Sequence, residues 1–355
     1  MKLGLGLYRD SLSQSNFQFA RQCGATHLVV HLVDYFKGVR PVLSRGTDEH
    51  GWGITQKQPH VWSEDNLGRI KSAIESNGLV WEAIENFDPS DWFDILLDGL
   101  ARETQMEGLK TIIRTVGKVG IPIIGYNFSI AGVWGWSKEA IGRGAAISLV
   151  FDESKIDTQL PIPNGMVWNM TYDPNARKGT VPPISHQELW YRYENFLKDI
   201  IPVAEEAGVK LALHPDDPPV ESLRLTARLV NQPSKYQKVI GIINSPNNCL
   251  EFCMGSIQEM TEGDIYESLK KYSSQNRIGY IHFRNVKGKV PNYREVFVDE
   301  GDIDMLKALR VLKDNKFEGV LIPDHTPEMS CDAQWHAGMA FALGYMKAAL
   351  QFLDK

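Results

Sequence analysis

Residues 187–219 read QELWYRYENFLKDIIPVAEEAGVKLALHPDDPP, and this stretch decides the fold. Its first part, Gln187 to Ala207, has the apolar spacing of an amphipathic helix. Lys210 to His214 follows as a short apolar run that ends in a histidine, as a buried strand does at the mouth of a barrel. Alternation of such helices and short apolar runs is typical of proteins built on a parallel sheet.

The same unit recurs along the chain. Eight apolar runs are predicted to be strands: Leu3 to Leu7, His27 to Leu32, Leu79 to Glu85, Ile121 to Asn127, Lys210 to His214, Leu250 to Cys253, Ile278 to His282 and Gly319 to Pro323. The clearest further helical patterns are Asp264 to Tyr272, Ile303 to Leu312 and Trp335 to Phe352. Eight units favour a closed (β/α)8 TIM barrel over an open sheet. We expect one barrel domain over residues 1–355.

One long segment, residues 129–185, interrupts this alternation. It contains Trp134, Trp136 and the proline-rich run Leu160 to Pro163. Because it follows the fourth predicted strand, it leaves the barrel at the face where barrel enzymes carry their active sites. We expect a cap over the substrate or a contact between subunits, with Trp134 and Trp136 as candidates to face a sugar. A surface insertion without a function is the alternative.

Composition excludes several classes of partner. The chain has 38 basic and 44 acidic residues, a net charge of −6, and no basic block that could follow a phosphate backbone, so we expect no nucleic-acid partner. It shows no signal peptide and no apolar run near the ~20 residues that span a bilayer. Its four cysteines are too few to cross-link a chain of this length. We expect a cytoplasmic protein without a membrane partner that forms a homodimer or higher homo-oligomer.

Four consecutive predicted strands end in side chains that bind metals. These are His214, Cys253, His282 and Asp324. Since the carboxyl ends of barrel strands meet at one rim, we expect the four to form the first coordination shell of one divalent ion. Imidazole, thiolate and carboxylate suit Mn²⁺, Fe²⁺, Co²⁺, Ni²⁺ or Zn²⁺ better than Ca²⁺ or Mg²⁺. Catalysis needs an ion that accepts further ligands, which favours Mn²⁺. Four unrelated polar strand ends are the alternative.

Polar residues beside these strand ends are candidates for substrate contact. Arg284, with Asn285 next to it, could clamp a carboxylate, because a guanidinium matches the geometry of that group; an ion pair is the alternative. His325 is the candidate general base, since the pKa of an imidazole lies near neutral pH. Asp216 and Asp217 could orient metal ligands or bind substrate hydroxyls.

These motifs resemble the D-mannonate dehydratases of hexuronate breakdown, a family of xylose-isomerase-like barrels. The resemblance is closest from Phe196 to Pro219, which ends in HPDDPP. It continues through Ser245-Pro-Asn-Asn248, Cys253-Met-Gly-Ser256, His282-Phe-Arg-Asn285, Gly301-Asp-Ile-Asp-Met305 and Pro323-Asp-His325. Weaker matches are Gly78-Leu-Val-Trp81 with Glu85, and Tyr126-Asn127-Phe128, whose Asn127 we take as a substrate contact. The motifs cover most of the chain after residue 190.

The resemblance implies a hydro-lyase that removes water from D-mannonate, or a related hexonate, to give 2-keto-3-deoxy-D-gluconate or its analogue. It also implies that Mn²⁺ is held by the same four residues. In such a reaction the ion would hold the substrate carboxylate and 2-hydroxyl and so acidify the C2 proton. In the family, the histidine after the metal-binding aspartate shares the proton transfers with a downstream tyrosine. The first is His325 here, and an alignment on Gly344 places His336 at the tyrosine position.

The chain departs from the family pattern at several places, which makes it a divergent member. Ile322 replaces an arginine, Thr326 replaces a glycine, and the loop Gly132 to Trp136 replaces an acidic, arginine-containing segment. The substrate could therefore be another sugar acid or a keto-sugar. A divalent-metal sugar isomerase or epimerase on the same barrel is the alternative enzyme, and a non-catalytic protein that binds a sugar acid is a third possibility.

Overall fold

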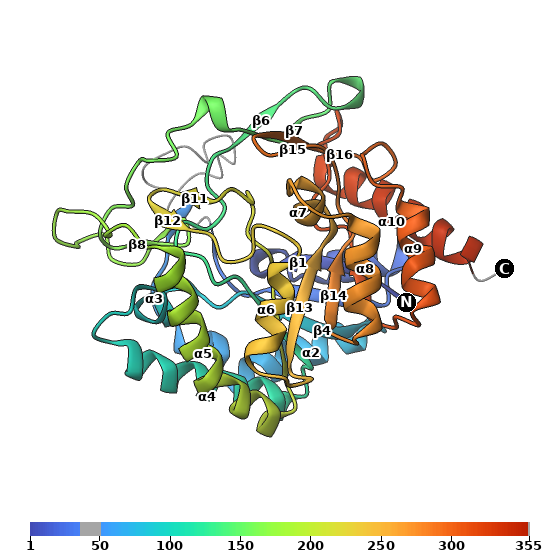
Figure 1. Cartoon of the computed structure of the whole chain (residues 1–355). Helices are drawn as coiled ribbons and strands as arrows, with labels where there is room; N and C mark the ends of the chain where they lie inside the picture. The colour runs from blue at the N-terminus through green and yellow to red at the C-terminus, as the bar shows by residue number, and fades with distance from the viewer. Residues whose placement is uncertain (36–50, 354–355) are drawn as a thin grey trace.

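The computed structural model describes residues 1–35 and 51–353. Its centre is a closed barrel of parallel strands in the order β1-β17-β14-β13-β10-β5-β4-β2 (Figure 1). These strands span Lys2–Tyr8 (β1), His27–His31 (β2), Val80–Glu85 (β4), Ile123–Tyr126 (β5), Lys210–Leu213 (β10), Asn248–Cys253 (β13), Ile278–His282 (β14) and Val320–Ile322 (β17). Each predicted strand forms one stave, so the predicted TIM barrel is confirmed.

The interior of the barrel is filled by side chains from alternate positions of the staves. One buried cluster joins Val29, Ala83, Ile123, Ala212, Cys249, Tyr280, Val320 and Ile322. Close approach of the strands leaves little space: a Cβ on Gly4 would lie 2.5 Å from Val320 Cγ1. A second, larger cluster packs the outer faces of the strands against the helices. The barrel is therefore a packed core that supports a site only at its ends.

Helices surround the barrel. They span Gln14–Gln22 (α1), Glu64–Ser76 (α2), Pro89–Leu97 (α3), Arg102–Val119 (α4), His186–Ala207 (α5), Lys235–Ile242 (α6), Met254–Glu259 (α7), Ile265–Ser274 (α8), Met305–Asp314 (α9) and Gln334–Leu353 (α10). Short 3-10 turns cover Arg9–Ser11, Pro59–Trp62, Arg143–Ala145 and Glu153–Lys155. Helix α5 begins at a capping box between Ser185 and Glu188 and ends at Gly208, whose φ is 68°. The four clearest predicted helices are α5, α8, α9 and α10.

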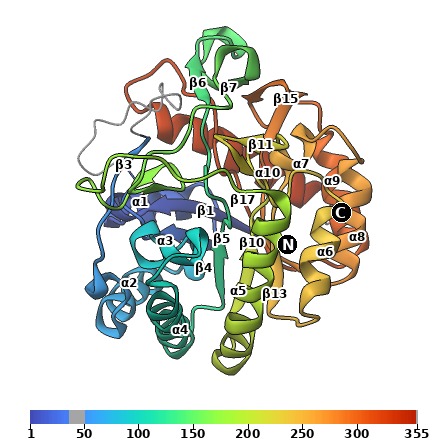
Figure 2. The same cartoon turned by 60° about the vertical axis from the view of Figure 1, so that its left-hand side comes forward.

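An antiparallel sheet lies over one end of the barrel (Figures 1 and 2). Its order is β15-β16-β7-β6, with β15 at Asn285–Lys289, β16 at Asn292–Val296, β7 at Ser148–Asp152 and β6 at Trp136–Glu139. Strands β6 and β7 belong to the predicted insertion, whereas β15 and β16 form a hairpin after β14. One smaller sheet has the order β3-β9-β8, with β3 at Gly53–Ile54, β8 at Met166–Val167 and β9 at Met170–Thr171. Another pairs β11 (Ser222–Leu223) with β12 (Thr226–Ala227). These short strands were not predicted from the sequence.

A buried arginine ties the insertion to the loop after β10. Arg228 donates from Nη1 to Ser129 Oγ and to the Gly132 carbonyl, both at 2.8 Å. Its Nε lies 3.2 Å from Asp216 Oδ1, and Asp216 Oδ2 accepts a hydrogen bond from the Val230 N–H at 2.7 Å. Since both charged side chains are fully buried, this pair holds the first turn of the insertion in place.

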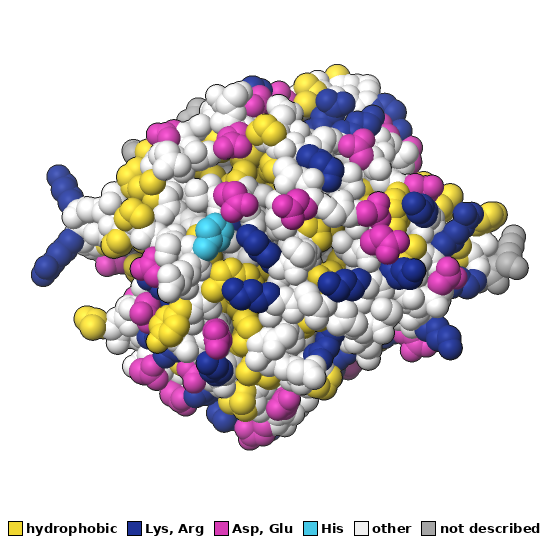
Figure 3. Space-filling view, viewed as in Figure 1, with side chains coloured by type: hydrophobic (Ala, Val, Ile, Leu, Met, Phe, Trp, Pro, Cys, Tyr) yellow, Lys and Arg dark blue, Asp and Glu magenta, His cyan; other side chains and the backbone are white. Residues whose placement is uncertain are grey.

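The visible surface is chemically mixed. On the face drawn in Figure 3, Lys and Arg side chains lie among Asp and Glu side chains rather than in a field of one sign. This agrees with the small net charge of −6. Within residues 1–35 and 51–353, no helix combines the length and the apolar character needed to cross a bilayer.

Candidate active site

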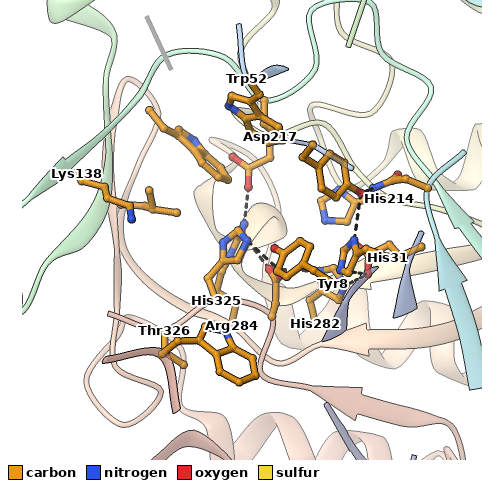
Figure 4. Close-up of a pocket in the computed structure, with 18 of the residues that line it drawn as sticks. Tyr8, His31, Trp52, Lys138, His214, Asp217, His282, Arg284, His325 and Thr326 are labelled. Carbon is orange, nitrogen blue, oxygen red and sulfur yellow. Dashed lines mark hydrogen bonds and ion pairs between the residues drawn. The ribbon is translucent and has the colours of Figure 1, made fainter. Parts of the chain in front are cut away.

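A cavity of about 300 Å³ opens at the end of the barrel that the antiparallel sheet covers. Its floor is made by residues at the carboxyl ends of the strands: Tyr8, His31, Glu85, His214, His282, Arg284, Asp324 and His325 (Figure 4). Aromatic side chains of Trp52, Trp136, Trp168 and Trp335 form its walls. Lys138, Ser148 and Leu149 line it from the insertion. This volume is at the lower end of the range for small-molecule sites.

Three of the four predicted metal ligands meet at the floor. One ligand atom from each of His214, Cys253 and His282 lies within 4.8 Å of the other two. Asp324 joins them through His282, since its Oδ2 lies 3.3 Å from His282 Nδ1. That buried Nδ1 has no hydrogen-bond partner among the described residues, so it is available to a cation. The donor set and this unpartnered nitrogen fit a divalent transition-metal ion.

Neighbouring groups fix the orientation of both imidazoles. His214 Nδ1 lies 2.5 Å from the Pro215 carbonyl, which leaves Nε2 to face the other ligands. His282 Nε2 lies 3.0 Å from Glu251 Oε1 and 3.3 Å from Glu85 Oε2, which leaves Nδ1 on the side of Asp324. A carboxylate or carbonyl on the far nitrogen is the usual support of a metal-binding histidine.

The chemistry of Cys253 also suits a metal ligand. Burial raises the pKa of its thiol, but the Arg284 guanidinium and the neighbouring imidazoles of His214 and His282 outweigh burial and lower the pKa to about 5. Cys253 is therefore a thiolate at neutral pH, which is the form that binds metals.

Asp324 holds a strained backbone conformation. Its φ of 64° lies in the left-handed region, which costs free energy for a residue with a side chain. The conformation turns the chain at the end of β17 and directs Asp324 and His325 into the same cavity. Such strain is retained where the surrounding structure over-determines it, often in functional sites.

Arg284 lies at the centre of a cluster of buried acids. Its Nη2 contacts Asp217 and lies 3.4 Å from Glu259 Oε1, and its Nη1 lies 3.0 Å from Glu295 Oε1 and 3.2 Å from Asp324 Oδ2. One guanidinium thus faces four carboxylates, all on largely buried side chains. The carboxyl groups outnumber the single guanidinium, which is a second reason why the floor of the cavity suits a cation.

His325 lies next to this cluster and remains partly open to the cavity. Its Nδ1 lies 2.9 Å from Glu295 Oε1, and its Nε2 lies 3.6 Å from Asp324 Oδ1. Burial lowers the pKa of His325, but Asp324 and Glu295 outweigh burial and raise it to about 9. A divalent cation held by Asp324 would oppose that rise and would favour the neutral imidazole that a general base needs.

The structure separates the remaining predicted site residues. Asn127 lines the cavity, as do Arg284 and His325, whereas Asp216, Asn285, Trp134 and His336 do not. Asp216 faces Arg228 as described above. Asn285 Nδ2 donates to the carbonyls of Val298 and Ile303, at 3.1 and 3.0 Å.

The other two residues outside the cavity also have protein neighbours. The Trp134 ring packs under the guanidinium of Arg224 at 5.1 Å, and Trp136 lies at the cavity wall instead. His336 Nε2 lies 2.9 Å from Asn16 Oδ1 on helix α1. The structure therefore does not bring His336 to the metal ligands or to His325.

Several cavity residues were not chosen from the sequence. Tyr8, His31 and Glu85 are the last residues of β1, β2 and β4, so the strand-end rule that gave the predicted metal ligands could also have pointed to them. Glu251 lies two positions before Cys253 and hence on the same face of β13. Glu295 comes from the β15–β16 hairpin, and no sequence signal marked it.

The chain is similar to known proteins over most of its length. The family model described as D-mannonate dehydratase (UxuA) matches residues 21–351. A mannonate dehydratase of Streptococcus pneumoniae (strain 70585) is 31% identical over 277 residues, 75% of this chain and 74% of that protein. Mannonate dehydratase 2 of Halalkalibacterium halodurans is 29% identical over 277 residues, 75% of this chain and 79% of that protein.

Solved structures are similar as well. The crystal structure of mannonate dehydratase from Streptococcus suis serotype 2 has a TM-score of 0.77 and 26% identity, covering 100% of this chain and 95% of that one. D-Psicose 3-epimerase from Clostridium cellulolyticum H10, solved with D-tagatose, has a TM-score of 0.55 and 13% identity, covering 99% and 98% of the two chains. The second likeness concerns the fold alone. The family model and the relatives together show that the chain belongs to the D-mannonate dehydratase (UxuA) family, whose named members are hydro-lyases.

Proposed function

We propose that this protein is a metal-dependent dehydratase that removes water from a hexonate, D-mannonate or a close relative, to give a 2-keto-3-deoxy acid. The observation that carries the proposal is the arrangement of one cavity floor, where a metal-ligand group and His325 lie side by side. His214, Cys253, His282 and Asp324 would hold the ion, with Mn²⁺ as the first choice and Fe²⁺, Co²⁺, Ni²⁺ or Zn²⁺ as alternatives. When bound there, a divalent cation supplies Lewis acidity to the carboxylate and 2-hydroxyl of the substrate.

In this proposal His325 is the general base that takes the C2 proton. Its Nδ1 side is occupied by Glu295, so Nε2 is the nitrogen left for the substrate. The side chain remains 28% exposed, which leaves the imidazole accessible from the cavity. Proton transfer by a positioned histidine contributes about 10²–10⁴-fold to a rate.

We propose a positioning role for Arg284 and a substrate-binding role for Lys138. Both Nη atoms of Arg284 already face protein carboxylates, so this guanidinium orients Asp324 and the His325–Glu295 pair rather than clamping a substrate. Lys138 on β6 lines the cavity from the insertion and pairs with Glu328. It is thus a cation that an anionic or hydroxyl-rich ligand reaches without displacing a buried acid.

The walls support a polyhydroxylated substrate. Trp52, Trp136, Trp168 and Trp335 offer flat apolar faces to the C–H groups of a sugar chain, while Asn86, Asn127 and Ser148 offer hydrogen-bonding groups. Three lining residues, Trp136, Lys138 and Ser148, come from residues 129–185. Part of the insertion would therefore act as the predicted cap over the substrate. Of the substrate contacts predicted from the sequence, Asn127, Trp136, Asp217 and Arg284 line the cavity.

The test is incubation of Mn²⁺-loaded protein with a panel of hexonates and pentonates, followed by assay for a 2-keto-3-deoxy product. Formation of that product from mannonate or an epimer supports the proposal. A panel left unchanged while the ion is bound contradicts it. An isomerase or epimerase, the alternative enzyme, would instead give a product of the same mass as a keto-sugar substrate, which mass spectrometry of the same mixtures detects.

The proposal also covers the cellular setting. We expect a cytoplasmic homodimer or higher homo-oligomer that acts in hexuronate degradation, a branch of carbohydrate metabolism. Size-exclusion chromatography with light scattering tests the oligomeric state, and growth of a deletion strain on hexuronates tests the pathway.

A further inference from the structure

Dehydration needs an acid as well as a base, because hydroxide is a poor leaving group unless it is protonated. His336, which the alignment placed at the position of the family tyrosine, lies on the side of helix α1. Its ring packs edge-on against Phe19 and Trp335, with centroids 4.8 and 4.9 Å apart, and its Nε2 faces Asn16. His336 is therefore not placed to protonate a leaving group in the cavity.

Tyr8 is the last residue of β1 and lines the floor of the cavity (Figure 4). Its ring stacks on the imidazole of His31, with centroids 4.6 Å apart and planes at 21°. His31 is itself held from both nitrogens, by the Tyr35 hydroxyl at 3.1 Å and by Glu85 Oε2 at 3.4 Å. The position of the Tyr8 ring is thus fixed by a neighbour that has no freedom to turn.

The hydroxyl of Tyr8 is available to a ligand. No hydrogen bond joins it to any residue in the described ranges, whereas the Tyr35 hydroxyl contacts both His31 and Asn86. Figure 4 shows Tyr8 among the labelled floor residues with His31, His282 and His325. A phenol hydroxyl with a fixed ring and no protein partner is arranged to donate to whatever enters the cavity.

Tyr8 also has the right protonation state. A tyrosine keeps its proton at neutral pH, since its ordinary pKa is about 10. Burial raises the pKa of Tyr8 further. Departure of hydroxide creates the negative charge that such an acid neutralises.

We propose that Tyr8 is the acid that protonates the departing 3-hydroxyl, an assignment that rests on the dehydratase function proposed above. The C2–H bond breaks and its proton passes to His325, while the electron pair forms the C2=C3 double bond. The C3–O bond breaks and the oxygen leaves as water with the proton of Tyr8. The resulting enol tautomerises to the 2-keto-3-deoxy acid. His325 ends with one proton more and Tyr8 with one fewer, and exchange with solvent restores both.

The test uses Tyr8→Phe, which keeps the ring that stacks on His31 and removes only the hydroxyl. Two substrates are compared: the active hexonate, and its analogue in which fluorine replaces the 3-hydroxyl. Fluoride leaves without a proton, so the analogue needs the base but not the acid. We expect dehydration of the hexonate to fall by about 10²–10⁴-fold. Fluoride release, measured with an ion-selective electrode, should stay within roughly threefold of the unsubstituted protein.

A second readout is exchange of the C2 hydrogen in D₂O, followed by NMR. Exchange should persist in Tyr8→Phe, because His325 still removes the C2 proton, and should be lost in His325→Ala. Tyr126→Phe is the matched control: it removes a hydroxyl from the last residue of β5, whose partner is the Tyr193 hydroxyl at 2.9 Å outside the cavity. Both reactions should be unchanged in that control.

The outcomes separate the two proposals. Hexonate dehydration that stays near the original rate in Tyr8→Phe overturns the role of Tyr8, as does an equal loss of dehydration and fluoride release with the metal content unchanged. Protein without any substitution that neither dehydrates a hexonate nor releases fluoride overturns the dehydratase function, and the role of Tyr8 falls with it. If Tyr8→Phe loses dehydration of the hexonate but keeps fluoride release from the 3-fluoro analogue, the role of Tyr8 is supported.

Discussion

Glu295 Oε1 lies 2.9 Å from Nδ1 of His325. Because a carboxylate only accepts, this contact places a proton on Nδ1 and leaves Nε2 for the substrate. In Glu295→Gln the amide can turn its NH₂ group to Nδ1 and favour the other tautomer. We expect kcat to fall by about 10–100-fold, the usual loss when a partner that orients an imidazole is removed. Steady-state kinetics on folded, metal-loaded protein measures this change in kcat.

The control for that change is Asp299→Asn. Asp299 follows the same hairpin but pairs with Arg143 at the surface, with side chains 30% and 48% exposed. Exposed pairs contribute little, about 0–1 kcal/mol, so kcat should not change. Equal losses in the two variants would show that the hairpin, rather than the tautomer, controls the rate.

Cys253→Ser should weaken metal binding. A hydroxyl replaces a thiolate whose pKa is lowered to about 5, and serine is a poor ligand for the ions in question. Metal analysis after reconstitution with Mn²⁺ should give close to one ion per unsubstituted chain and far less for the variant. Added Mn²⁺ should raise the Tm of the unsubstituted protein, since binding to the folded state alone stabilises it. Cys249→Ser, on the same strand but inside the barrel, is the control for metal content. An unsubstituted protein that binds no ion and shows no Tm shift would falsify the metal site.

His325→Ala and His336→Ala should behave differently. The first removes the proposed base and should abolish turnover while the metal content stays the same. The second removes a ring that lies against Asn16 and Phe19 rather than in the cavity, so turnover should be retained with a modest loss of stability. Loss of metal from His325→Ala would make this residue a ligand instead. Loss of turnover from His336→Ala would restore the role that the alignment assigned to it.

Lys138→Met should weaken substrate binding. The substitution keeps the length of the side chain and removes the charge that lines the cavity. If Lys138 contacts the substrate through one charge-assisted hydrogen bond, KM should rise about tenfold, and kcat should change little. Lys155→Met is the control, because Lys155 is 55% exposed and pairs with Glu139 and Asp152 outside the cavity lining. An unchanged KM in Lys138→Met would remove this lysine from the binding site.

The buried carboxyl of Asp91, which lies outside the cavity lining, should make the stability of the fold depend on pH. Burial, together with Asp88, raises the pKa of Asp91 to about 6, although Trp62 Nε1 donates to it at 2.9 Å. Because this folded-state value lies above the unfolded value, the protonated carboxyl stabilises the fold below about pH 4, and that contribution is lost as the pH rises through about 6.

Asp91→Asn removes the charge but keeps an acceptor for Trp62. Near neutral pH the free energy of unfolding should therefore rise, by at most about 3 kcal/mol. The gain should vanish near pH 4, where the carboxyl of the original protein is protonated. Urea unfolding near neutral pH and near pH 4 measures the free energy of unfolding of the two proteins. An equal gain at the two pH values would contradict the assignment of the pKa shift to Asp91.

The sequence predicted the barrel because its signal is repeated and local. Each stave is an apolar run, and one unit reinforces the next, so an error of a few residues at a boundary changes nothing. The predicted metal ligands followed from the same regularity, since residues at the ends of β10, β13 and β14 and just beyond β17 meet at one rim. His31 was not among the predicted site residues, although its place at the end of β2 obeys the same rule.

The remaining parts of the site depend on long-range pairing that one sequence does not display. Trp134 and Trp136 are two residues apart and equally suited to a sugar, and only the path of the insertion decides that Trp136 reaches the cavity. Arg284 has the chemistry to bind a substrate carboxylate, but it already pairs with Glu259 of α7 and Glu295 of β16. Which groups surround a charge is a property of the folded loops, not of the local pattern.

The ladder between β7 and β16 has a consequence for how this enzyme can diversify. Phe151 of the insertion pairs with Tyr293, two residues before Glu295. A mutation that reshapes the insertion for a longer or bulkier sugar acid therefore also moves the strand that sets the tautomer of His325. With His325 as the proposed base, substrate range and proton transfer would be coupled through this ladder, and a graft of a relative's insertion should carry its β15–β16 hairpin along.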